Sequence, residues 1–376
     1  MNLSFQTDNY SVTYAGEIVQ LLRKEFALLQ YLFNNANHAF TREELLNAVW
    51  PLEAPSDRTV DDHVYRLRKK LNTWNHFMSI DTVKGYGYRL RVHDQQTGSP
   101  LVHDEEFKRL ASHLFNKYHL FGQGAALNTL IQQEALGIEV ERSMRVIIAF
   151  MKGDVANFIN TEEFSFSEKA LFHFYFYMMI TDKPDQVIVY YENARKKDIF
   201  SNDNRDEAMI LSPVTFYILA RDFEKARKHF EIANDHIAQE SGFYPFLQLN
   251  LMMYHMCLNE PSKVTTTINH MNDFFSEKPY QREFGLFHVL KGLFTIQQGK
   301  NEQGKGLIHK GLHITRQTRF QSHIFLTIKI SLFMLQHYIH EPDLYKQLNT
   351  EWSTFNQDYD FEKIEAEIDR QLKEHL

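Results

Sequence analysis

The sequence holds a single cysteine, Cys257, among its 376 residues. One thiol excludes an internal disulfide framework and suits a reducing compartment. The longest apolar run, Leu171 to Ile180, spans ten residues and contains His173, whereas a helix needs about 20 to cross a bilayer. The first residues form a polar strand pattern, without a basic-then-apolar signal segment. We therefore expect a cytoplasmic protein that does not enter membranes.

Motifs for catalysis are also missing. No G-x-S-x-G or paired-carboxylate pattern appears. The stretch Gly299 to Lys305 has the spacing of a phosphate-binding loop, but Gly306 stands where Ser or Thr would hold Mg²⁺, and a helical pattern precedes it. His309 and His313 lie one helical turn apart without a third metal-ligand motif. Cys257 lies among methionines with no base near it in the sequence, which is typical of an inert thiol. We predict no enzymatic activity, no metal and no cofactor.

The composition is that of a soluble protein of more than one domain. Hydrophobic residues make up 43% and charged residues 24%, and a chain of this length exceeds one ordinary core. The net charge of −7 argues against a protein that coats nucleic acid over its whole surface. Between Arg66 and Arg91, however, seven basic residues stand against one acid, Asp81. That local concentration is typical of a DNA-binding surface.

The stretch from Asp57 to Leu71 predicts an amphipathic helix with a basic outer face. Its narrow apolar face carries Val60, Val64, Leu67 and Leu71; its opposite face carries Arg58, Asp62, Tyr65, Arg66 and Lys69, with Arg68 and Lys70 on the flanks. A rod of this width and charge fits the major groove, where Arg can bond a guanine edge in bidentate fashion. Taken alone, the stretch is more typical of a solvated surface helix than of a DNA-binding one.

The flanking patterns favour the DNA-binding interpretation. Ile80 to Val92 predicts two short strands around a tip at Lys84 to Gly87. Upstream, the segments 3–6, 11–14 and 17–20 resemble strands, and Arg23 to Asn35 has helical periodicity. The sequence Thr41-Arg-Glu-Glu44 is a capping box that begins a further helix, Arg42 to Val49. A basic helix followed by a basic hairpin indicates a winged helix-turn-helix.

This order resembles the OmpR/PhoB-type winged-helix family over roughly residues 3–92. The matching segments are Arg23–Leu29, Thr41–Leu46 with Val49 and Trp50, Asp57–Asp61 with His63, Arg66–Arg68 with Leu71, and Thr82–Arg89. The resemblance implies that Arg66 contacts bases, that Arg58, Arg68 and Arg89 lie near phosphates, and that Lys84 enters the neighbouring minor groove. The predicted DNA-binding set is Arg58, Asp62, Tyr65, Arg66, Arg68, Lys69, Lys84, Tyr86 and Arg89. The resemblance also implies that the loop Trp50–Ser56 corresponds to the surface that some family members present to RNA polymerase.

Four departures from the family limit what can be transferred. Leu22 stands where Thr or Ser commonly caps the first helix, so we expect a weaker cap. Tyr65 replaces a common second Arg, and Asp62 replaces a common apolar residue; its carboxylate can accept a bond from cytosine N4. The operator therefore cannot be taken from relatives. No receiver domain precedes this module in the sequence, so we expect control to come from the C-terminal region.

The C-terminal region predicts repeated helix pairs. Residues 94–104 have the polar, Gly-Ser-Pro character of a linker between a domain of residues 1–93 and one of residues 105–376. From Glu105 on, apolar helices are interrupted by polar breaks at Gly153-Asp154, 182–184, Arg221-Asp222, 259–261, Gly299-Lys300 and 340–342. Small residues recur near the breaks, including Gly292, Gly304 and Gly311, and allow paired helices to approach closely. The arrangement is similar to tetratricopeptide-like repeats, which form α-solenoids.

In such a solenoid the first helix of each pair lines a concave surface. The repeat geometry places there Phe172, Phe176, Met179, Leu211, Thr215, Ile218, Phe246, Leu249, Met253, Met256, Leu286, Val289 and Leu293. An open surface of this kind is an exposed apolar patch, typical of a binding site. From it we predict a ligand set of Phe176, Asn250, Met253, Met256, Val289, Leu293 and Gln297. The alternative is that the superhelix closes, or a dimer partner covers the surface, and these residues are core.

Together the patterns predict a mainly α protein, an N-terminal winged helix-turn-helix (α+β) followed by an all-α tetratricopeptide-like solenoid. By resemblance it is a bacterial one-component transcription regulator that binds double-stranded DNA as a homodimer. Three roles for the C-terminal region stay open: binding a signal such as a short peptide, dimerisation alone, or docking a second protein. A scaffold whose winged helix has lost DNA binding is a further alternative, against which the retained Arg66, Arg68 and Lys84 argue.

Overall fold

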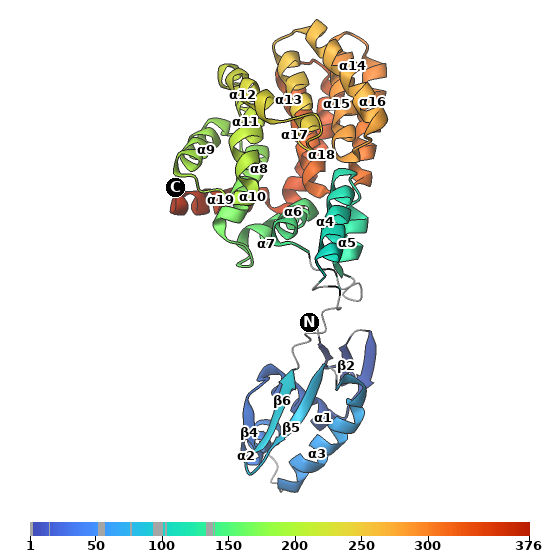
Figure 1. Ribbon diagram of the computed structural model, residues 1–376, viewed down its shortest axis with the longest axis vertical. Helices are drawn as coiled ribbons and strands as arrows, with labels where there is room; N and C mark the ends of the chain where they lie inside the picture. Colours follow the sequence, from blue (N-terminus) through green and yellow to red (C-terminus); the bar gives the residue numbers. More distant parts are fainter. Residues whose placement is uncertain are drawn as a thin grey trace. The chain divides into compact units, whose positions relative to one another are not determined.

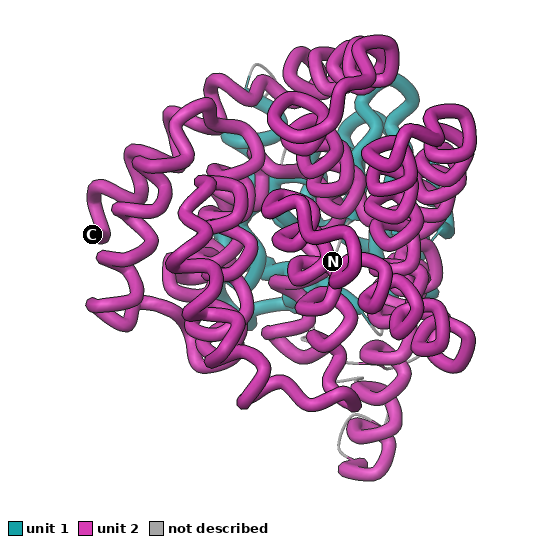
Figure 2. The backbone as a smooth tube through the Cα atoms, turned by 90° about the horizontal axis from the view of Figure 1, so that it is seen from above, with its two compact units in different colours: residues 1–100 teal, residues 101–376 magenta. Residues whose placement is uncertain are grey.

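The computed structural model describes residues 3–14, 16–51, 57–75, 77–92, 101, 104–132, 138 and 140–376. They belong to two compact units, residues 1–100 and residues 101–376, which Figure 2 colours separately. Each unit has a core of its own, and neither core includes a residue of the other. Separate cores of this kind are typical of separate domains.

Unit 1 combines two small antiparallel sheets with helices (Figure 1). The first sheet has the order β1 (Ser4–Gln6), β2 (Ser11–Tyr14), β3 (Glu17–Gln20), and the second has the order β4 (Ala39–Thr41), β6 (Gly87–Val92), β5 (Met78–Val83). The helices are α1 (Arg23–Asn34), α2 (Arg42–Val49) and α3 (Asp57–Lys70), followed by a 3₁₀ turn, η1 (Asn72–Trp74). β4 was not expected from the sequence; it pairs with β6 in the register Phe40 to Tyr88.

The core of unit 1 confirms the predicted inner face of α3. Val60, Val64, Leu67 and Leu71 are all buried. They pack in one cluster with α1 and α2 and with the fully buried Trp74. The helix is thus held by four side chains at steps of four, three and four, the spacing of one helical face.

A glutamate carboxylate accepts a backbone N–H at the starts of α1 and α2. The predicted capping box of α2 is present: Glu44 N donates to Thr41 Oγ1 at 3.2 Å, and Thr41 N donates to Glu44 Oε2 at 2.7 Å. At α1, Leu22 cannot cap through its side chain, but its backbone N–H donates to Glu25 Oε2 at 2.8 Å. The same buried carboxylate lies 2.7 Å from Lys70 Nζ, so it joins the start of α1 to the end of α3.

Unit 2 is all helical in its described residues (Figure 1). The helices are α4 (Glu105–Leu120), α5 (Gly124–Gln132), α6 (Arg142–Lys152), α7 (Val155–Asn160), α8 (Phe166–Ile180), α9 (Pro184–Lys197), α10 (Asn202–Asp206), the π-helix η4 (Glu207–Leu211), α11 (Ser212–Leu219), α12 (Phe223–His236), α13 (Tyr244–Cys257), α14 (Pro261–Glu277), α15 (Gln281–Gln297), α16 (Asn301–Gln317), α17 (Gln321–His337), α18 (Pro342–Tyr359) and α19 (Phe361–His375). Each of the six breaks noted in the sequence marks a junction between two of these helices, and three of them end on the proline that begins the next helix: Pro184, Pro261 and Pro342. None of the helices in the described residues has the length and apolar character needed to cross a bilayer.

Glycines bring α15 and α16 into close contact. A Cβ atom on Gly292 would lie 2.6 Å from the Gly304 carbonyl oxygen, and one on Gly311 would lie 2.5 Å from the Gly285 carbonyl oxygen. Real side chains do not tolerate such distances from backbone atoms. The pair of helices can therefore pack this closely only because both faces lack side chains at these positions.

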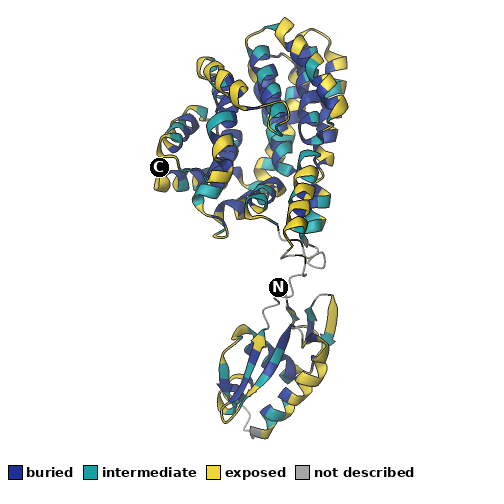
Figure 3. Ribbon diagram, in the orientation of Figure 1, coloured by how far each residue is buried: buried dark blue, intermediate teal, exposed yellow. Residues whose placement is uncertain are grey.

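The helix pairs of unit 2 do not remain an open stack. α17 packs against α6 and α8, and α19 packs against α7 and α8. Hydrogen bonds reinforce this closure: His173 Nε2 lies 3.0 Å from Gln371 Oε1, and Thr181 Oγ1 donates to Glu365 Oε1 at 2.7 Å. Figure 3 shows the result, since α8, α15 and α17 are mostly buried. The closed arrangement that the sequence analysis gave as the alternative to an open groove is the one observed.

Candidate functional site

The outer face of α3 is exposed and carries positive charge. Arg58, Arg66 and Lys69 are all exposed, and none of them forms a hydrogen bond or ion pair with another described residue. Tyr65 on the same face is 69% exposed, and Asp62 adds one acid. Within the described part of the chain these side chains remain available to a ligand, while the opposite face of the helix is fixed in the core. A rigid basic rod of this kind fits the major groove of DNA.

The tip of the β5–β6 hairpin carries a further exposed cation. Lys84 and Tyr86 are both exposed, and the Tyr86 N–H donates to the Val83 carbonyl at 3.0 Å to close the turn. Gly85 has a φ of +74°, a conformation that glycine adopts without the steric cost paid by other residues. The turn therefore presents Lys84 at the end of a paired ribbon.

Two arginines of the predicted DNA-binding set are engaged within unit 1. Arg68 Nε donates to the Ile80 carbonyl at 2.8 Å and Arg68 Nη2 to Thr82 Oγ1 at 2.9 Å. Arg89 is half-buried, with Nη2 3.6 Å from Asp81 Oδ2. Arg68 thus connects α3 to β5, a role that the sequence pattern did not indicate. Arg68 therefore has fewer free N–H groups to offer a phosphate than Arg66 has.

A second polar cluster fixes α3 relative to α2 and β6. Arg42 Nε and Tyr88 Oη each donate to Asp61 Oδ1, both at 2.7 Å, and the Arg42 guanidinium lies 5.0 Å from the centre of the Tyr88 ring. Partial burial acts to raise the pKa of Asp61, but the bonds from Tyr88 and Arg42 and the positive charge outweigh it and lower that pKa. Asp61 therefore stays ionised at neutral pH and holds the three elements together.

The loop predicted as an RNA polymerase surface begins with a buried residue. Trp50 is buried and meets the His63 ring edge-on, with ring centroids 5.0 Å apart. Lys24 Nζ donates to the Val49 carbonyl at 2.8 Å beside it. Residues 52–56 of the Trp50–Ser56 loop lie outside the described residues.

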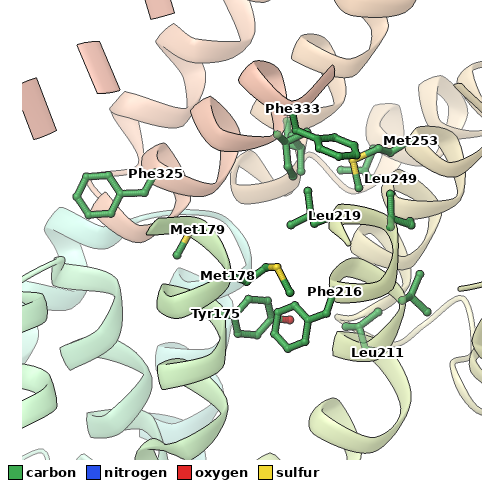
Figure 4. Close-up of a cluster of buried hydrophobic side chains, with 14 of the residues drawn as sticks. Tyr175, Met178, Met179, Leu211, Phe216, Leu219, Leu249, Met253, Phe325 and Phe333 are labelled. Carbon is green, nitrogen blue, oxygen red and sulfur yellow. The ribbon is translucent and has the colours of Figure 1, made fainter. Parts of the chain in front are cut away.

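The predicted ligand set of unit 2 lies in the core instead of on an open surface. Phe176, Asn250, Met253, Met256, Val289 and Leu293 are buried, and Gln297 is half-buried. Met253 packs in the apolar cluster drawn in Figure 4, together with Leu249. Asn250 Nδ2 donates to the Phe246 carbonyl at 2.9 Å, and Gln297 Nε2 to the Met256 carbonyl at 3.3 Å, so both amides are used within the unit. The groove prediction is wrong for these residues because the closed helices cover them.

A cavity of about 350 Å³ does exist in unit 2, at a different place. Its lining comes from α4, α6, α8, the segment α10–η4, residues 241–246, α15 and α17. Five of the predicted concave positions line it: Phe172, Met179, Leu211, Phe246 and Leu286. None of the seven residues of the predicted ligand set does. The sequence periodicity therefore identified the inner helices and five positions that border the cavity, but the ligand set chosen from these helices lies away from it.

Sequence reasoning missed the polar residues of this cavity. Arg282, Glu283 and Glu207 all line it. The available signal was a pair of charged residues, Arg282 and Glu283, near the start of the otherwise apolar α15, where both are buried. Buried charges are rare unless they are paired or serve a site.

Comparison with known proteins places unit 1 among transcription regulators. Residues 16–90 match the family model described as "Transcriptional regulatory protein, C terminal". Over 90 residues the chain is 38% identical to the heme response regulator HssR of Staphylococcus epidermidis, covering 24% of this chain and 40% of that protein. Over 92 residues it is 41% identical to the transcriptional regulatory protein VxrB of Vibrio cholerae, covering 24% of this chain and 36% of that protein. The chain thus spans about two-fifths of the length of these relatives.

Among solved structures, the DNA-binding domain of Bacillus subtilis CssR is similar to this chain. The match is 34% identical and covers 24% of this chain and 99% of that domain, with a TM-score of 0.21. The family match spans α1, α2, α3 and the β5–β6 hairpin up to Leu90. The N-terminal unit is a winged-helix DNA-binding domain of the OmpR/PhoB type.

Proposed function

We propose that this chain is a sequence-specific DNA-binding regulator of transcription, in which α3 lies in the major groove and the β5–β6 tip contacts the adjacent minor groove. The exposed face of α3 is the observation that carries the proposal: Arg58, Arg66 and Lys69 have no partner among the described residues, and the opposite face of the helix is buried. In this arrangement Arg66 contacts base edges, and Arg58 contacts a phosphate. Arg68 and Arg89 lie near phosphates as secondary contacts, because each already has partners within the unit.

The remaining members of the DNA-binding set have supporting roles in this proposal. Lys84 enters the minor groove with Tyr86 beside it at the hairpin tip, and Lys69 adds a backbone contact at the end of α3. Tyr65 and Asp62 contact bases that Arg66 does not reach. The Asp62 carboxylate repels phosphates, so it favours a place beside a base edge that can donate a hydrogen bond. The Trp50–Ser56 loop is a candidate contact for RNA polymerase.

The proposed role of unit 2 is to sense a ligand and to dimerise, in a tetratricopeptide-like arrangement. A single winged helix covers little DNA, and specific affinity usually comes from two half-sites about one helical turn apart. We therefore propose a homodimer held by unit 2. Light scattering at micromolar concentration tests this: a monomer both free and on DNA contradicts it.

A docking scaffold is the second candidate for unit 2. It is favoured by the exposed apolar side chains Leu110 and Leu114 on α4, which an unpaired monomer leaves in water. In that case the unit binds another protein and responds to no small ligand. A ligand that changes the DNA affinity of the full chain distinguishes sensing from scaffolding.

The proposed DNA binding is tested by selection from random duplexes with the full chain. We expect enrichment of one motif, repeated about one helical turn apart. The affinity for the selected duplex should fall steeply with salt, because each neutralised phosphate contributes about −0.9 to the slope of log K against log salt. Absence of an enriched motif, with binding that depends on salt alone, contradicts sequence-specific function.

A further inference from the structure

The cavity in unit 2 has a mostly apolar, aromatic wall. Phe150 from α6, Phe172 and Tyr175 from α8, Leu286 from α15 and Leu326 from α17 contribute to it. Its volume of about 350 Å³ lies in the range of about 300–1,000 Å³ that is common for small-molecule sites. Figure 4 shows Tyr175 on α8 and Leu211 at the end of η4. The π-helix η4 itself borders the cavity, and such segments occur often at functional sites.

The charged groups of the lining are mainly acidic. Asp203, Glu207 and Glu283 stand against a single guanidinium, that of Arg282, which leaves a net charge of −2 when all four are ionised. Burial and the charge of Arg282 lower the pKa of His323 to about 3, so its ring is neutral at physiological pH. Burial likewise holds the pKa of the lining residue His119 well below its usual value.

The one cation of the lining already has partners. Arg282 Nε donates to Glu283 Oε1, Nη1 lies 2.9 Å from His119 Nε2, and Nη2 lies 3.4 Å from the Gly242 carbonyl oxygen. Arg282 is only 9% exposed. An anionic ligand would compete with these contacts for the same N–H groups. The structure therefore does not leave Arg282 available as an anion receptor.

Among the acids, Glu283 is buried with one oxygen that has no partner in the described residues, whereas Glu207 is half-buried. Glu207 accepts a hydrogen bond from Tyr175 Oη at 3.2 Å and forms no ion pair with another described residue. Glu283 is 4% exposed and Ser322 is 2% exposed; Glu283 Oε2 and Ser322 Oγ have no hydrogen-bond partner within the described part of the chain. Burial raises the pKa of both glutamates, although the charge of Arg282 acts against it. A buried carboxylate without a full set of donors costs free energy that an added cation would recover.

We propose that the cavity binds a molecule with an apolar body and a primary ammonium group, the body against the aromatic wall and the ammonium held by Glu207 and Glu283, with Ser322 as a further polar contact. Glu207, Glu283 and Ser322 all line this one cavity. The inference deepens, and rests on, the ligand-sensing role proposed above. An aliphatic amine and the N-terminus of a short apolar peptide share this chemistry.

Matched probes test the head group first. Calorimetry with the full chain compares n-octylamine, octanoate and 1-octanol, which share one tail. Octylamine should bind at least about tenfold more tightly than the other two, because hydrogen bonds between charged partners are about twice as strong as neutral ones. Equal or tighter binding of octanoate overturns the proposal, and equal binding of octanol reduces the site to an apolar cavity and overturns it as well.

Variants test the residues. Glu207→Gln and Glu283→Gln should each weaken octylamine at least about tenfold and leave octanol unchanged. Glu302→Gln is the matched control, because Glu302 is exposed on α16 and does not line the cavity. Unchanged octylamine affinity in both cavity variants overturns the assignment. Where a variant fails to fold, as its melting curve shows, the head-group comparison on the wild type decides.

Peptide probes distinguish the source of the ammonium. Tri-leucine amide is compared with its N-acetylated form, which lacks the charge. If the free-amine peptide binds more tightly than octylamine, the result supports a peptide N-terminus, and the reverse supports a small amine. If the acetylated peptide binds as tightly as the free-amine peptide, the result counts against the proposal. All these titrations are done without DNA, and a separate measurement compares the DNA affinity of the full chain with and without octylamine. If octylamine binds selectively but leaves the DNA affinity unchanged, the proposed sensing function fails while the proposed site stands.

Discussion

Replacing Met253 with glutamate tests whether unit 2 is closed as described. Met253 is 1% exposed, within the apolar cluster of Figure 4. Keeping a buried carboxyl group neutral at pH 7 means raising its pKa from about 4.3 to above 7, which costs about 3.7 kcal/mol. Losing part of the buried methionine surface adds to this, since fully burying such a side chain is worth about 1.5–3 kcal/mol. We expect Met253→Glu to lower the free energy of unfolding of unit 2 by about 4–6 kcal/mol.

Urea unfolding followed by far-ultraviolet circular dichroism measures this loss, because unit 2 contributes most of the helices. The two units are fitted as separate transitions, since a two-domain chain is not expected to unfold in one step. Met253→Leu is the control and should cost less than about 1.5 kcal/mol. The deficit of Met253→Glu should shrink by about 1.36 kcal/mol per pH unit as the pH falls from 7 to about 4.3, and should stay constant below that, where the glutamate is protonated in the unfolded chain too. An unchanged unfolding midpoint at pH 7 would refute the closed packing and return Met253 to an open surface.

Three further predictions concern specific contacts. Arg68→Ala should destabilise unit 1 by about 1 kcal/mol in urea unfolding, because it removes the bonds from α3 to β5; no loss of stability would make Arg68 a free surface residue. Gly292→Ala should lower the free energy of unfolding by about 1–3 kcal/mol, because the new Cβ meets the Gly304 carbonyl. Gly306→Ala is the control and should be neutral or stabilising, because nothing lies within 4 Å of its Cβ position. Equal melting temperatures of the two variants would contradict the close α15–α16 packing. The bonds from Arg142 and Ser165 lower the pKa of Glu168 to about 2, although partial burial opposes them. A lowered carboxyl pKa stabilises the fold above the unfolded pKa of about 4.3 and loses that effect as the pH falls towards 2. The melting-temperature gap between wild type and Glu168→Gln should therefore narrow from pH 6 to pH 3; a constant gap would contradict this.

The features set by local chemistry were predictable from the sequence. The capping box of Thr41 and Glu44 needs only two residues at fixed spacing, and the buried face of α3 follows from four apolar residues at helical steps. The six breaks in the C-terminal region were also visible, since each combines polar residues with glycine, proline or a residue that turns the chain. Arg221 and Asn259 at two of these breaks have positive φ, which ends a helix.

Features that depend on tertiary packing were not predictable. β4 has three residues and no alternating pattern of its own, and it exists as a strand because β6 pairs with it. Arg68 resembled a phosphate contact because nothing in the sequence indicates that the Ile80 carbonyl lies beside it. The ligand prediction failed for the same reason: the return of α17 and α19 onto the earlier helices decides which side of an inner helix meets the cavity.

The central claim is that the exposed face of α3 recognises a DNA sequence, and Arg66 tests it most directly. Its guanidinium has no partner among the described residues, so Arg66→Ala should leave the melting temperature unchanged. Losing one bidentate contact with a base should cost about 1–3 kcal/mol, or roughly 5- to 150-fold in Kd, in titrations of the full chain on a selected duplex. The preference at one base pair should relax as well, whereas Lys84→Ala should weaken all duplexes evenly. Unchanged affinity and unchanged sequence preference of Arg66→Ala would contradict the account.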